Sequence, residues 1–385
     1  MNYSIPFNKP FIIGKELYYI AQAVLNGQIS GDGPYTKLCQ QLLENAFAAQ
    51  RVLLTTSCTS ALEMAAMLCD IQPGDEVILP SYTFVSTANA FYLRGAKLVF
   101  VDIRPDTLNL DEALVEPAIT TRTKAIVPVH YAGVGCEMES INSLARKHGL
   151  VVIEDAAQGV NAKYQGSFLG TLGDLGTYSF HETKNFICGE GGALVINNSK
   201  FIERAEIIRE KGTNRSKFFR GQVDKYTWVD MGSSYVPSDI LAAFLYGQLE
   251  NMATITQKRE SIYKTYYQLL LPLVEHGLLT LPVIPETCES NYHMFYILLK
   301  NNNTRMSLIR HLKEHGILAV FHYIPLHTSP IGQTMGYSSG MLPVTEQISE
   351  RLLRLPFYFE LQENDIMTVA REIFTFFNVN FSEGR

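Results

Sequence analysis

The chain lacks the sequence signs of several large classes of protein. Its 385 residues include only six cysteines, which show neither CxxC pairs nor zinc-like spacing. No apolar stretch approaches the ~20 residues that a membrane-spanning helix needs, and basic runs are absent. The net charge of -6 argues against binding to nucleic acid or anionic membranes through charge alone. We therefore expect a cytoplasmic protein with reduced thiols that binds neither nucleic acid nor membrane.

Several familiar enzyme motifs are missing as well. GxSxG, Walker A and GxGxxG motifs do not occur, so hydrolase, kinase and dinucleotide-binding functions lack support. Five histidines are candidate metal ligands, but they form neither HExxH nor another familiar metal spacing. They are His130, His181, His293, His322 and His327. We predict no metal site.

Apolar residues are abundant enough for a large buried core. They make up 46% of the chain, against 18% charged residues. Several short β-rich runs are continuously apolar, which is typical of a sheet buried on both faces. Helical periodicity between these runs, as at 60–69 and 140–148, predicts a doubly wound α/β domain with about seven mostly parallel strands. The predicted strands are 52–54, 76–79, 97–101, 125–129, 151–154, 177–180 and 193–196.

The pattern changes after Asp239. Helical periodicity then dominates, with two short β-rich runs among the helices. The predicted helices are 240–250, 263–273, 307–315, 349–353 and 363–377, and the predicted strands are 294–299 and 319–322. We predict a large domain at 1–245 and a smaller C-terminal α+β domain at 246–385.

Two residues at predicted strand ends indicate the chemistry. Asp155 ends an apolar strand, and Lys184 lies in a loop between Phe180 and Phe186. A glycine-rich run at 189–192 follows. In doubly wound sheets, active sites lie beyond the carboxyl ends of the strands. A buried lysine can form a Schiff base with pyridoxal phosphate (PLP), and an aspartate can keep the pyridine nitrogen protonated.

Each of these residues has a simpler explanation when taken alone. Lys184 could be a solvated charge, and Asp155 could pair with an arginine or bind magnesium. Their occurrence together at strand ends favours one PLP site.

Other residues could complete that site. The hydroxyl-rich run 55–60 precedes a helical segment, and the start of a helix can bind a phosphate. Ser179 could add a hydroxyl. An aromatic residue in the run 80–85 could stack on the pyridine ring, and Gln158 could donate to the phenolic oxygen of the cofactor. The alternatives are an ordinary helix cap, core packing and a surface amide.

The combined motifs resemble a known family. Ser-Phe-x-x-x-Lys at 179–184 precedes Gly-Glu-Gly-Gly at 189–192, and Glu-Asp-x-Ala-Gln lies upstream at 154–158. This pattern resembles the sugar aminotransferases of the DegT/DnrJ/EryC1/StrS family, and the resemblance covers nearly the whole chain. It implies a fold-type I PLP enzyme, a nucleotide-sugar substrate, an amino-acid donor and a homodimer with shared active sites.

The resemblance also implies roles for individual residues. Lys184 would be the Schiff-base lysine, and Asp155 the partner of the pyridine nitrogen. Phe84 would stack on the ring, and Gln158 would lie near the phenolic oxygen. The phosphate would be bound by Cys58, Thr59 and Ser179, and the substrate approached by Tyr323 and His327.

The chain departs from the family pattern at two places. Ser57-Cys58-Thr59 stands where the family commonly has Ser-Gly-Thr, although the Cys58 N–H could still bind phosphate. The family's Asn-Tyr-Arg brings an asparagine to the partner subunit's phosphate, and this chain has Ser234-Tyr235-Val236 there. We expect Ser234 to replace that asparagine with a shorter reach.

The run 211–220 resembles the branch that acts on dTDP-4-keto-6-deoxy-D-glucose. It implies transamination of the C4 ketone with L-glutamate, giving the 4-amino-4,6-dideoxy-D-galactose product or its D-glucose epimer. Four cations, Lys211, Arg215, Arg220 and Lys225, could bind the diphosphate, although they could equally be a solvated loop. Two other functions stay open: a PLP-dependent sugar dehydratase, which would have histidine in place of Lys184, and a non-catalytic PLP-binding regulator.

Overall fold

The main sheet has seven strands, and four of its six pairings are parallel. The computed structural model describes residues 3–381. The strand order is β1-β9-β8-β5-β4-β2-β3, and only the two pairings of β9, with β1 and with β8, are antiparallel. The bounds are β1 (Arg51–Thr55), β2 (Glu76–Pro80), β3 (Lys97–Val101), β4 (Thr123–Ile126), β5 (Val151–Asp155), β8 (Leu175–Ser179) and β9 (Gly192–Ile196). The predicted mostly parallel sheet is confirmed, and each predicted strand overlaps an observed one.

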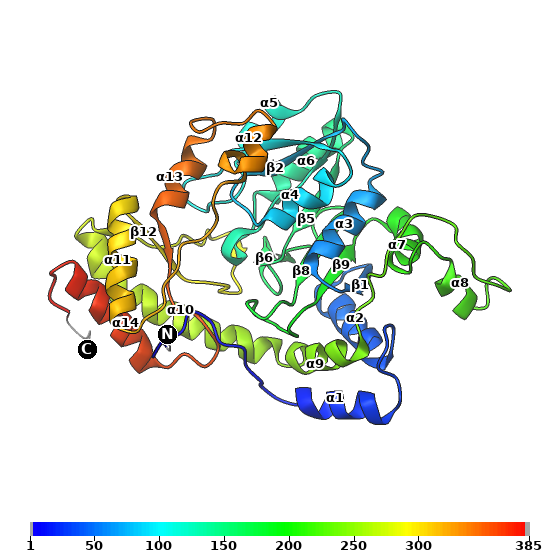
Figure 1. Ribbon diagram of the computed structural model, residues 1–385, viewed down its shortest axis with the longest axis horizontal. Helices are drawn as coiled ribbons and strands as arrows, with labels where there is room; N and C mark the ends of the chain where they lie inside the picture. The colour runs from blue at the N-terminus through cyan, green and yellow to red at the C-terminus, as the bar shows by residue number, and fades with distance from the viewer. Residues whose placement is uncertain (1–2, 382–385) are drawn as a thin grey trace.

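Helices cover both faces of this sheet (Figure 1). Those before residue 250 are α1 (Glu16–Leu25), α2 (Pro34–Phe47), α3 (Cys58–Leu68), α4 (Val85–Tyr92), α5 (Val115–Ala118), α6 (Met138–His148), α7 (Ile202–Arg209), α8 (Arg215–Phe219) and α9 (Asp239–Leu249). Successive residues of a strand point to opposite faces. Accordingly, Val52 and Leu54 belong to one buried cluster and Leu53 to another. This double burial explains the continuously apolar runs in the sequence.

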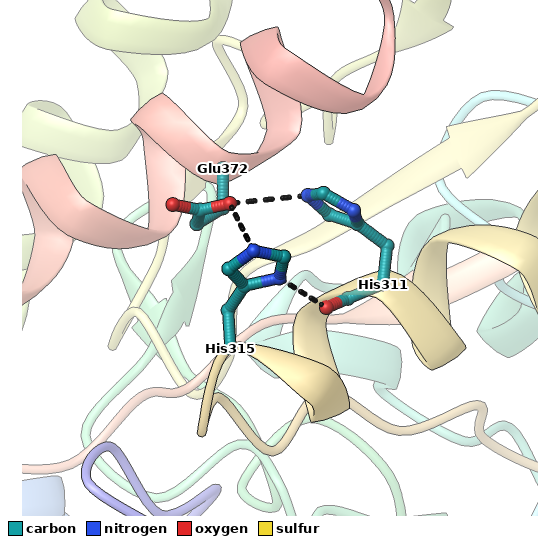
Figure 2. Close-up of side chains that lie close together, drawn as sticks. All are labelled: His311, His315 and Glu372. Atoms are coloured by element: carbon teal, nitrogen blue, oxygen red, sulfur yellow. Dashed lines mark hydrogen bonds and ion pairs between the residues drawn. The ribbon is translucent and has the colours of Figure 1, made fainter.

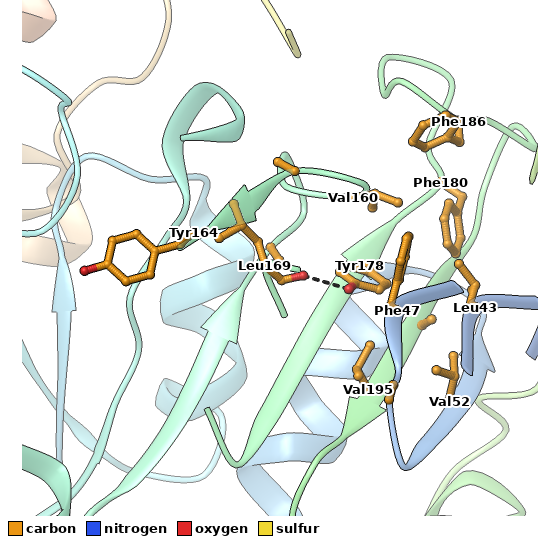
Figure 3. Packing of buried hydrophobic residues seen from close by; sticks show 14 of the residues in the cluster. Leu43, Phe47, Val52, Val160, Tyr164, Leu169, Tyr178, Phe180, Phe186 and Val195 are labelled. Carbon is orange, nitrogen blue, oxygen red and sulfur yellow. Dashed lines mark hydrogen bonds between the residues drawn. The ribbon is translucent and has the colours of Figure 1, made fainter. Parts of the chain in front are cut away.

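Figure 3 shows the first of these clusters. Phe47 of α2 lies 5.8 Å from Tyr178 of β8, measured between ring centroids. The Tyr178 hydroxyl is buried and donates a hydrogen bond to the Leu169 carbonyl at 2.7 Å. A buried hydroxyl needs such a partner. The packing holds β8, and therefore the loop that follows it, against α2.

The C-terminal part has its own sheet and core. Strands β10 (Leu279–Thr280), β12 (Tyr296–Leu299) and β13 (Leu352–Arg354) form an antiparallel sheet. The helices are α10 (Met252–Glu275), α11 (Asn302–Glu314), α12 (Pro330–Thr334), α13 (Pro343–Arg351) and α14 (Glu363–Phe376). A third small sheet joins β6 (Lys163–Tyr164), β7 (Ser167–Phe168) and β11 (Cys288–Glu289).

The N-terminal segment packs with this C-terminal core. Ile5 is buried there, and its N–H donates to the Gly316 carbonyl at 3.1 Å. The predicted boundary at residue 245 falls inside α9, so the division into two domains stays a prediction. Within residues 3–381, no helix is long and apolar enough to cross a membrane.

Two predicted C-terminal elements are wrong in detail. Residues 319–322 form no strand but a single bridge between Val320 and Arg354, because the chain then turns toward the main sheet and Tyr131. The helix expected at 349–353 ends earlier, as α13, because Leu352 and Leu353 are buried in β13. Buried pairing with β12 overrides their helical periodicity.

Candidate active site

Three segments meet beyond the carboxyl ends of strands β1, β5 and β8 of the main sheet. Thr55 at the end of β1 and Ser179 at the end of β8 both pair with Gly192, the first residue of β9. The loop 180–191 and the start of α3 are therefore neighbours. Asp155 ends β5, which pairs with β8 at the same edge. The topology therefore places Asp155, the loop that carries Lys184 and the start of α3 beyond the same end of the sheet.

A cavity of about 630 Å³ lies at this edge. Its volume is in the range of small-molecule binding sites. Eight of the predicted site residues line it: Cys58, Thr59, Phe84, Asp155, Gln158, Ser179, Lys184 and Tyr323. They come from segments that are far apart in sequence, so the fold brings them together.

Lys184 is held in a tight loop. Its N–H donates to the His181 carbonyl at 2.9 Å, and the loop is closed by hydrogen bonds between Phe180 and Gly191 and between Phe180 and Cys188. Burial lowers the pKa of the Lys184 amine, and the proximity of Cys58 and Asp155 opposes that shift. A lowered pKa increases the fraction of unprotonated amine, which is the nucleophilic form.

Asp155 presents a buried carboxylate to the same cavity. It is 5% exposed. Its Oδ2 accepts from the Thr87 hydroxyl at 2.7 Å, and its Oδ1 accepts from the Ala157 N–H at 3.1 Å. Among residues 3–381, no ion pair involves Asp155, so the salt bridge considered from the sequence is not present. A carboxylate can accept about four hydrogen bonds, which leaves capacity for a protonated ring nitrogen.

The start of α3 offers donors for a phosphate. Ser57 caps the helix, and its Oγ accepts from the Ser60 N–H at 3.1 Å. The first N–H groups of a helix have no partner within it, so those of Cys58 and Thr59 can bind an anion. A Cβ at Gly192 would lie 2.4 Å from the Cys58 nitrogen, so glycine is required for this close approach. Ser179 adds a hydroxyl to the lining.

Gln158 and two aromatic residues form another wall. The Gln158 Oε1 accepts from the Ala132 N–H at 2.7 Å, and its Nε2 donates to the Tyr323 hydroxyl at 2.9 Å. Phe84 is 56% exposed, and its ring centroid lies 6.4 Å from that of Tyr323. The accessible Phe84 ring is available for stacking on a planar ligand.

The donor set fits PLP. A nucleophilic amine, a buried carboxylate, an accessible aromatic face and a cluster of amide and hydroxyl donors all face one cavity of suitable size. These are the groups needed for the aldehyde, pyridine nitrogen, ring and phosphate of that cofactor.

Four predicted site residues do not line this cavity. His327 is fully buried; its Nδ1 lies 2.7 Å from the Ser81 hydroxyl and its Nε2 lies 3.0 Å from Glu346. It therefore anchors the segment that carries Tyr323. Arg215 pairs with Glu210 and Arg220 pairs with Glu206. The fourth, Ser234, is exposed and bridges to Glu210.

The position of α8 explains the absence of Arg215 and Arg220 from this cavity. Helix α8 lies at one end of the molecule and α11 and α14 at the other (Figure 1). Neither α8 nor the glutamates that pair with the two arginines contribute a residue to the lining of the cavity.

The structure adds residues that the sequence analysis did not assign. His322, His293 and Arg354 line the cavity. Burial, with the nearby charges of Lys184 and Arg354, lowers the pKa of both histidines well below the usual range. Both rings are therefore neutral at physiological pH. Arg354 lies in the run Leu-Arg-Leu-Pro at 353–356, near the C-terminal end of the chain.

The chain is similar to known aminotransferases along most of its length. Residues 11–374 match the DegT/DnrJ/EryC1/StrS aminotransferase family. The spore coat polysaccharide biosynthesis protein SpsC of Bacillus subtilis is 32% identical, over 97% of each chain. The aminotransferase TlmJ of Streptoalloteichus hindustanus has 30% identity and a TM-score of 0.88, covering 97% of this chain and 99% of TlmJ. The PLP form of the Streptococcus pneumoniae sugar aminotransferase Spr1654 has 25% identity and a TM-score of 0.89, covering 97% and 98%.

Proposed function

Because this chain belongs to the DegT/DnrJ/EryC1/StrS aminotransferase family, we propose that Lys184 holds PLP in the cavity and that the substrate is dTDP-4-keto-6-deoxy-D-glucose. Family membership makes the protein a PLP-dependent enzyme that transfers an amino group to a sugar ketone. The observation that carries the residue assignment is the convergence of Lys184, Asp155 and the start of α3 on one cavity.

Each wall of the cavity has a distinct task in this proposal. PLP, when bound, supplies an electron-accepting ring that stabilises negative charge on the reacting carbon. The Asp155 carboxylate accepts a hydrogen bond from the ring nitrogen and favours its protonated form. The N–H groups of Cys58 and Thr59, with the Ser179 hydroxyl, bind the phosphate. Phe84 orients the ring by stacking.

Lys184 has a second task as an acid and base. Its Nζ, with a pKa lowered by burial, can take a proton from the substrate carbon and return it to another position. A positioned base of this kind typically accelerates a reaction by about 10²–10⁴-fold. The dehydratase alternative needs histidine at this position and is disfavoured by Lys184.

The α8 region supports a homodimer. Apolar side chains are exposed close to the predicted diphosphate-binding cations, with 69% of Phe219, 78% of Trp228 and 51% of Val229 accessible. Exposed apolar clusters commonly mark protein interfaces. We assign this face to a second copy of the chain, with Arg215, Arg220 and Ser234 reaching toward the partner's cavity.

This arrangement predicts a specific effect on substrate affinity. In Arg215→Ala and Arg220→Ala, the KM for the nucleotide sugar should rise about tenfold or more, because each variant loses charge-assisted hydrogen bonds to the diphosphate. Steady-state kinetics of the purified dimer measures this. Lys217→Ala is the matched control, because Lys217 lies on the same helix and pairs with Glu203. An unchanged KM in both arginine variants would remove the diphosphate role.

The proposed reaction has a direct test. The enzyme is incubated with dTDP-4-keto-6-deoxy-D-glucose and L-glutamate, and proton coupling constants at C4 of the product are determined by NMR. We expect the 4-amino-4,6-dideoxy-D-galactose configuration, a sugar of the enterobacterial common antigen pathway. The D-glucose epimer would correct the stereochemistry alone, whereas the absence of any aminated sugar would refute this substrate.

A further inference from the structure

Three side chains with metal-binding chemistry gather on the C-terminal part of the chain. His311 lies in the last turn of α11, His315 directly follows that helix, and Glu372 lies in α14. The three side chains point toward one another (Figure 2). Each offers one ligand atom, and these atoms all lie within 4.8 Å of one another. None of the three residues lines the active-site cavity.

The packing of two helices places these groups. The two histidines are four residues apart, so they lie on the same face of α11, and their ring centroids are 4.4 Å apart. Leu312 of α11 and Ile373 of α14 are both buried in the C-terminal core. Each of these apolar residues directly follows a member of the cluster, His311 or Glu372. The core contact between the helices therefore brings the carboxylate of α14 to the histidine face of α11.

One carboxylate oxygen faces both imidazole rings. The Glu372 Oε2 lies 3.1 Å from His311 Nε2 and 3.6 Å from His315 Nε2. Zinc bonds of ~2.0–2.2 Å at tetrahedral angles would place neighbouring ligand atoms ~3.3–3.5 Å apart. The two observed distances lie on either side of that range, so small side-chain movements would give the geometry of a zinc site.

The protonation of His315 favours a cation between these atoms. Its Nδ1 lies 2.8 Å from the His311 carbonyl oxygen, which can only accept, so this nitrogen carries a hydrogen. In the neutral ring, Nε2 then presents a lone pair to the Glu372 carboxylate, at a distance too long for a hydrogen bond. A histidine whose other nitrogen donates to a carbonyl is the usual form of a metal ligand.

We infer that His311, His315 and Glu372 bind a divalent transition metal, with Zn²⁺ as the expected ion. Two imidazole nitrogens select against Mg²⁺ and Ca²⁺, which prefer oxygen ligands. The His315 side chain is 47% exposed, so water can reach the fourth tetrahedral position. The bound ion joins the end of α11 to α14. This site is separate from the proposed aminotransferase chemistry and does not depend on it.

The inference runs against the sequence-based prediction of no metal site. Glu372 lies 61 residues after His311, so the three ligands form no compact motif. The carboxylate reaches the histidines only because α14 packs beside α11. Packing of distant helices is not visible in the local spacing of histidines.

Calorimetry tests the site on the holoenzyme. Untagged, PLP-loaded enzyme is treated with EDTA, dialysed and titrated with zinc chloride. We expect one zinc ion per chain in the wild type. Loss of a group that only orients a metal ligand costs ~10–100-fold in affinity, and His315→Ala and Glu372→Gln, which each remove a ligand, should lose at least as much. Magnesium chloride should show no binding to the same site.

His148→Ala is the matched control. His148 Nε2 lies 3.1 Å from a Glu116 oxygen, which is the same kind of pair as that of His311 and Glu372 without a second histidine. This variant should bind zinc as the wild type does. Equal zinc affinity in the wild type, His315→Ala and Glu372→Gln would overturn the inference, and so would the absence of zinc binding to the wild type. Either result would leave the cluster as an ion pair.

Thermal unfolding gives a second readout and shows whether each variant is folded. Zinc at saturating concentration should raise the Tm of the wild type and of His148→Ala, because a ligand that binds only the folded state stabilises it. It should leave the Tm of His315→Ala and Glu372→Gln unchanged. An equal rise of Tm in all four proteins would place the zinc elsewhere and contradict the assignment.

Discussion

Lys184→Ala should abolish transamination and remove the absorbance band of PLP that is linked to the lysine. The variant loses both the amine that holds the cofactor and the base that moves the proton. We expect kcat/KM to fall by at least the ~10²–10⁴-fold that a positioned base contributes. Single-turnover kinetics with L-glutamate, followed by cofactor absorbance, measures the effect. Lys163→Ala is the matched control, because Lys163 pairs with Glu289 and does not line the cavity.

The conservative variant Lys184→Arg separates charge from nucleophilicity. Arginine remains protonated and cannot attack the aldehyde, so this variant should be as inactive as Lys184→Ala. PLP should still bind both variants without a covalent link, because the donors at the start of α3 are unchanged. A wild-type rate in either variant would assign the chemistry to another amine.

Asp155→Asn should produce the second largest loss of catalytic rate, after the Lys184 variants. The amide has nearly the shape of the carboxylate but carries no charge to favour a protonated ring nitrogen. We expect kcat of both half-reactions to fall by about 10²-fold, corresponding to a charge-assisted hydrogen bond of up to about 3 kcal/mol. Stopped-flow absorbance measures each half-reaction, and thermal unfolding checks that the fold is retained.

Thr87→Val refines the interpretation of Asp155. It removes the 2.7 Å hydrogen bond to Oδ2 while leaving the charge in place. The expected loss is smaller than for Asp155→Asn, because only the orientation of the carboxylate changes. A wild-type kcat in Asp155→Asn would contradict the assigned contact between Asp155 and the cofactor ring.

The sequence was most informative where chemistry coincides with a strand end. The meeting of Asp155 and Lys184 at one cavity could be predicted because continuously apolar runs indicate buried strands, and loops at the carboxyl ends of parallel strands converge. Glycine is required at position 192 because the backbone there lies close to Cys58. Apolar runs and strand ends are local patterns, and recognising them needs no knowledge of long-range packing.

Residues contributed by the C-terminal part were harder to predict. His327 lies four residues after Tyr323, yet only Tyr323 reaches the cavity, because His327 turns to Ser81 and Glu346. Arg354 reaches the cavity from β13, which lies in a different sheet from β5, which ends at Asp155, and from β8, which precedes the loop that carries Lys184. Such placements depend on how distant segments pack.

The position of α8 illustrates another limit. A sequence motif can indicate phosphate-binding cations without indicating which cavity they serve. Arg215 and Arg220 pair with glutamates of their own chain at the far end of the molecule from α11 and α14 (Figure 1). Their assignment to a partner's cavity therefore depends on oligomerisation and stays a prediction.

Chemical mapping of the cofactor attachment point tests the central assignment most directly. The PLP-loaded enzyme is reduced with borohydride, which fixes the cofactor to the amine that holds it, and is then digested and analysed by mass spectrometry. We predict one pyridoxyl group per chain, located on Lys184. A label on a different lysine, or none on a catalytically active preparation, would contradict the assignment.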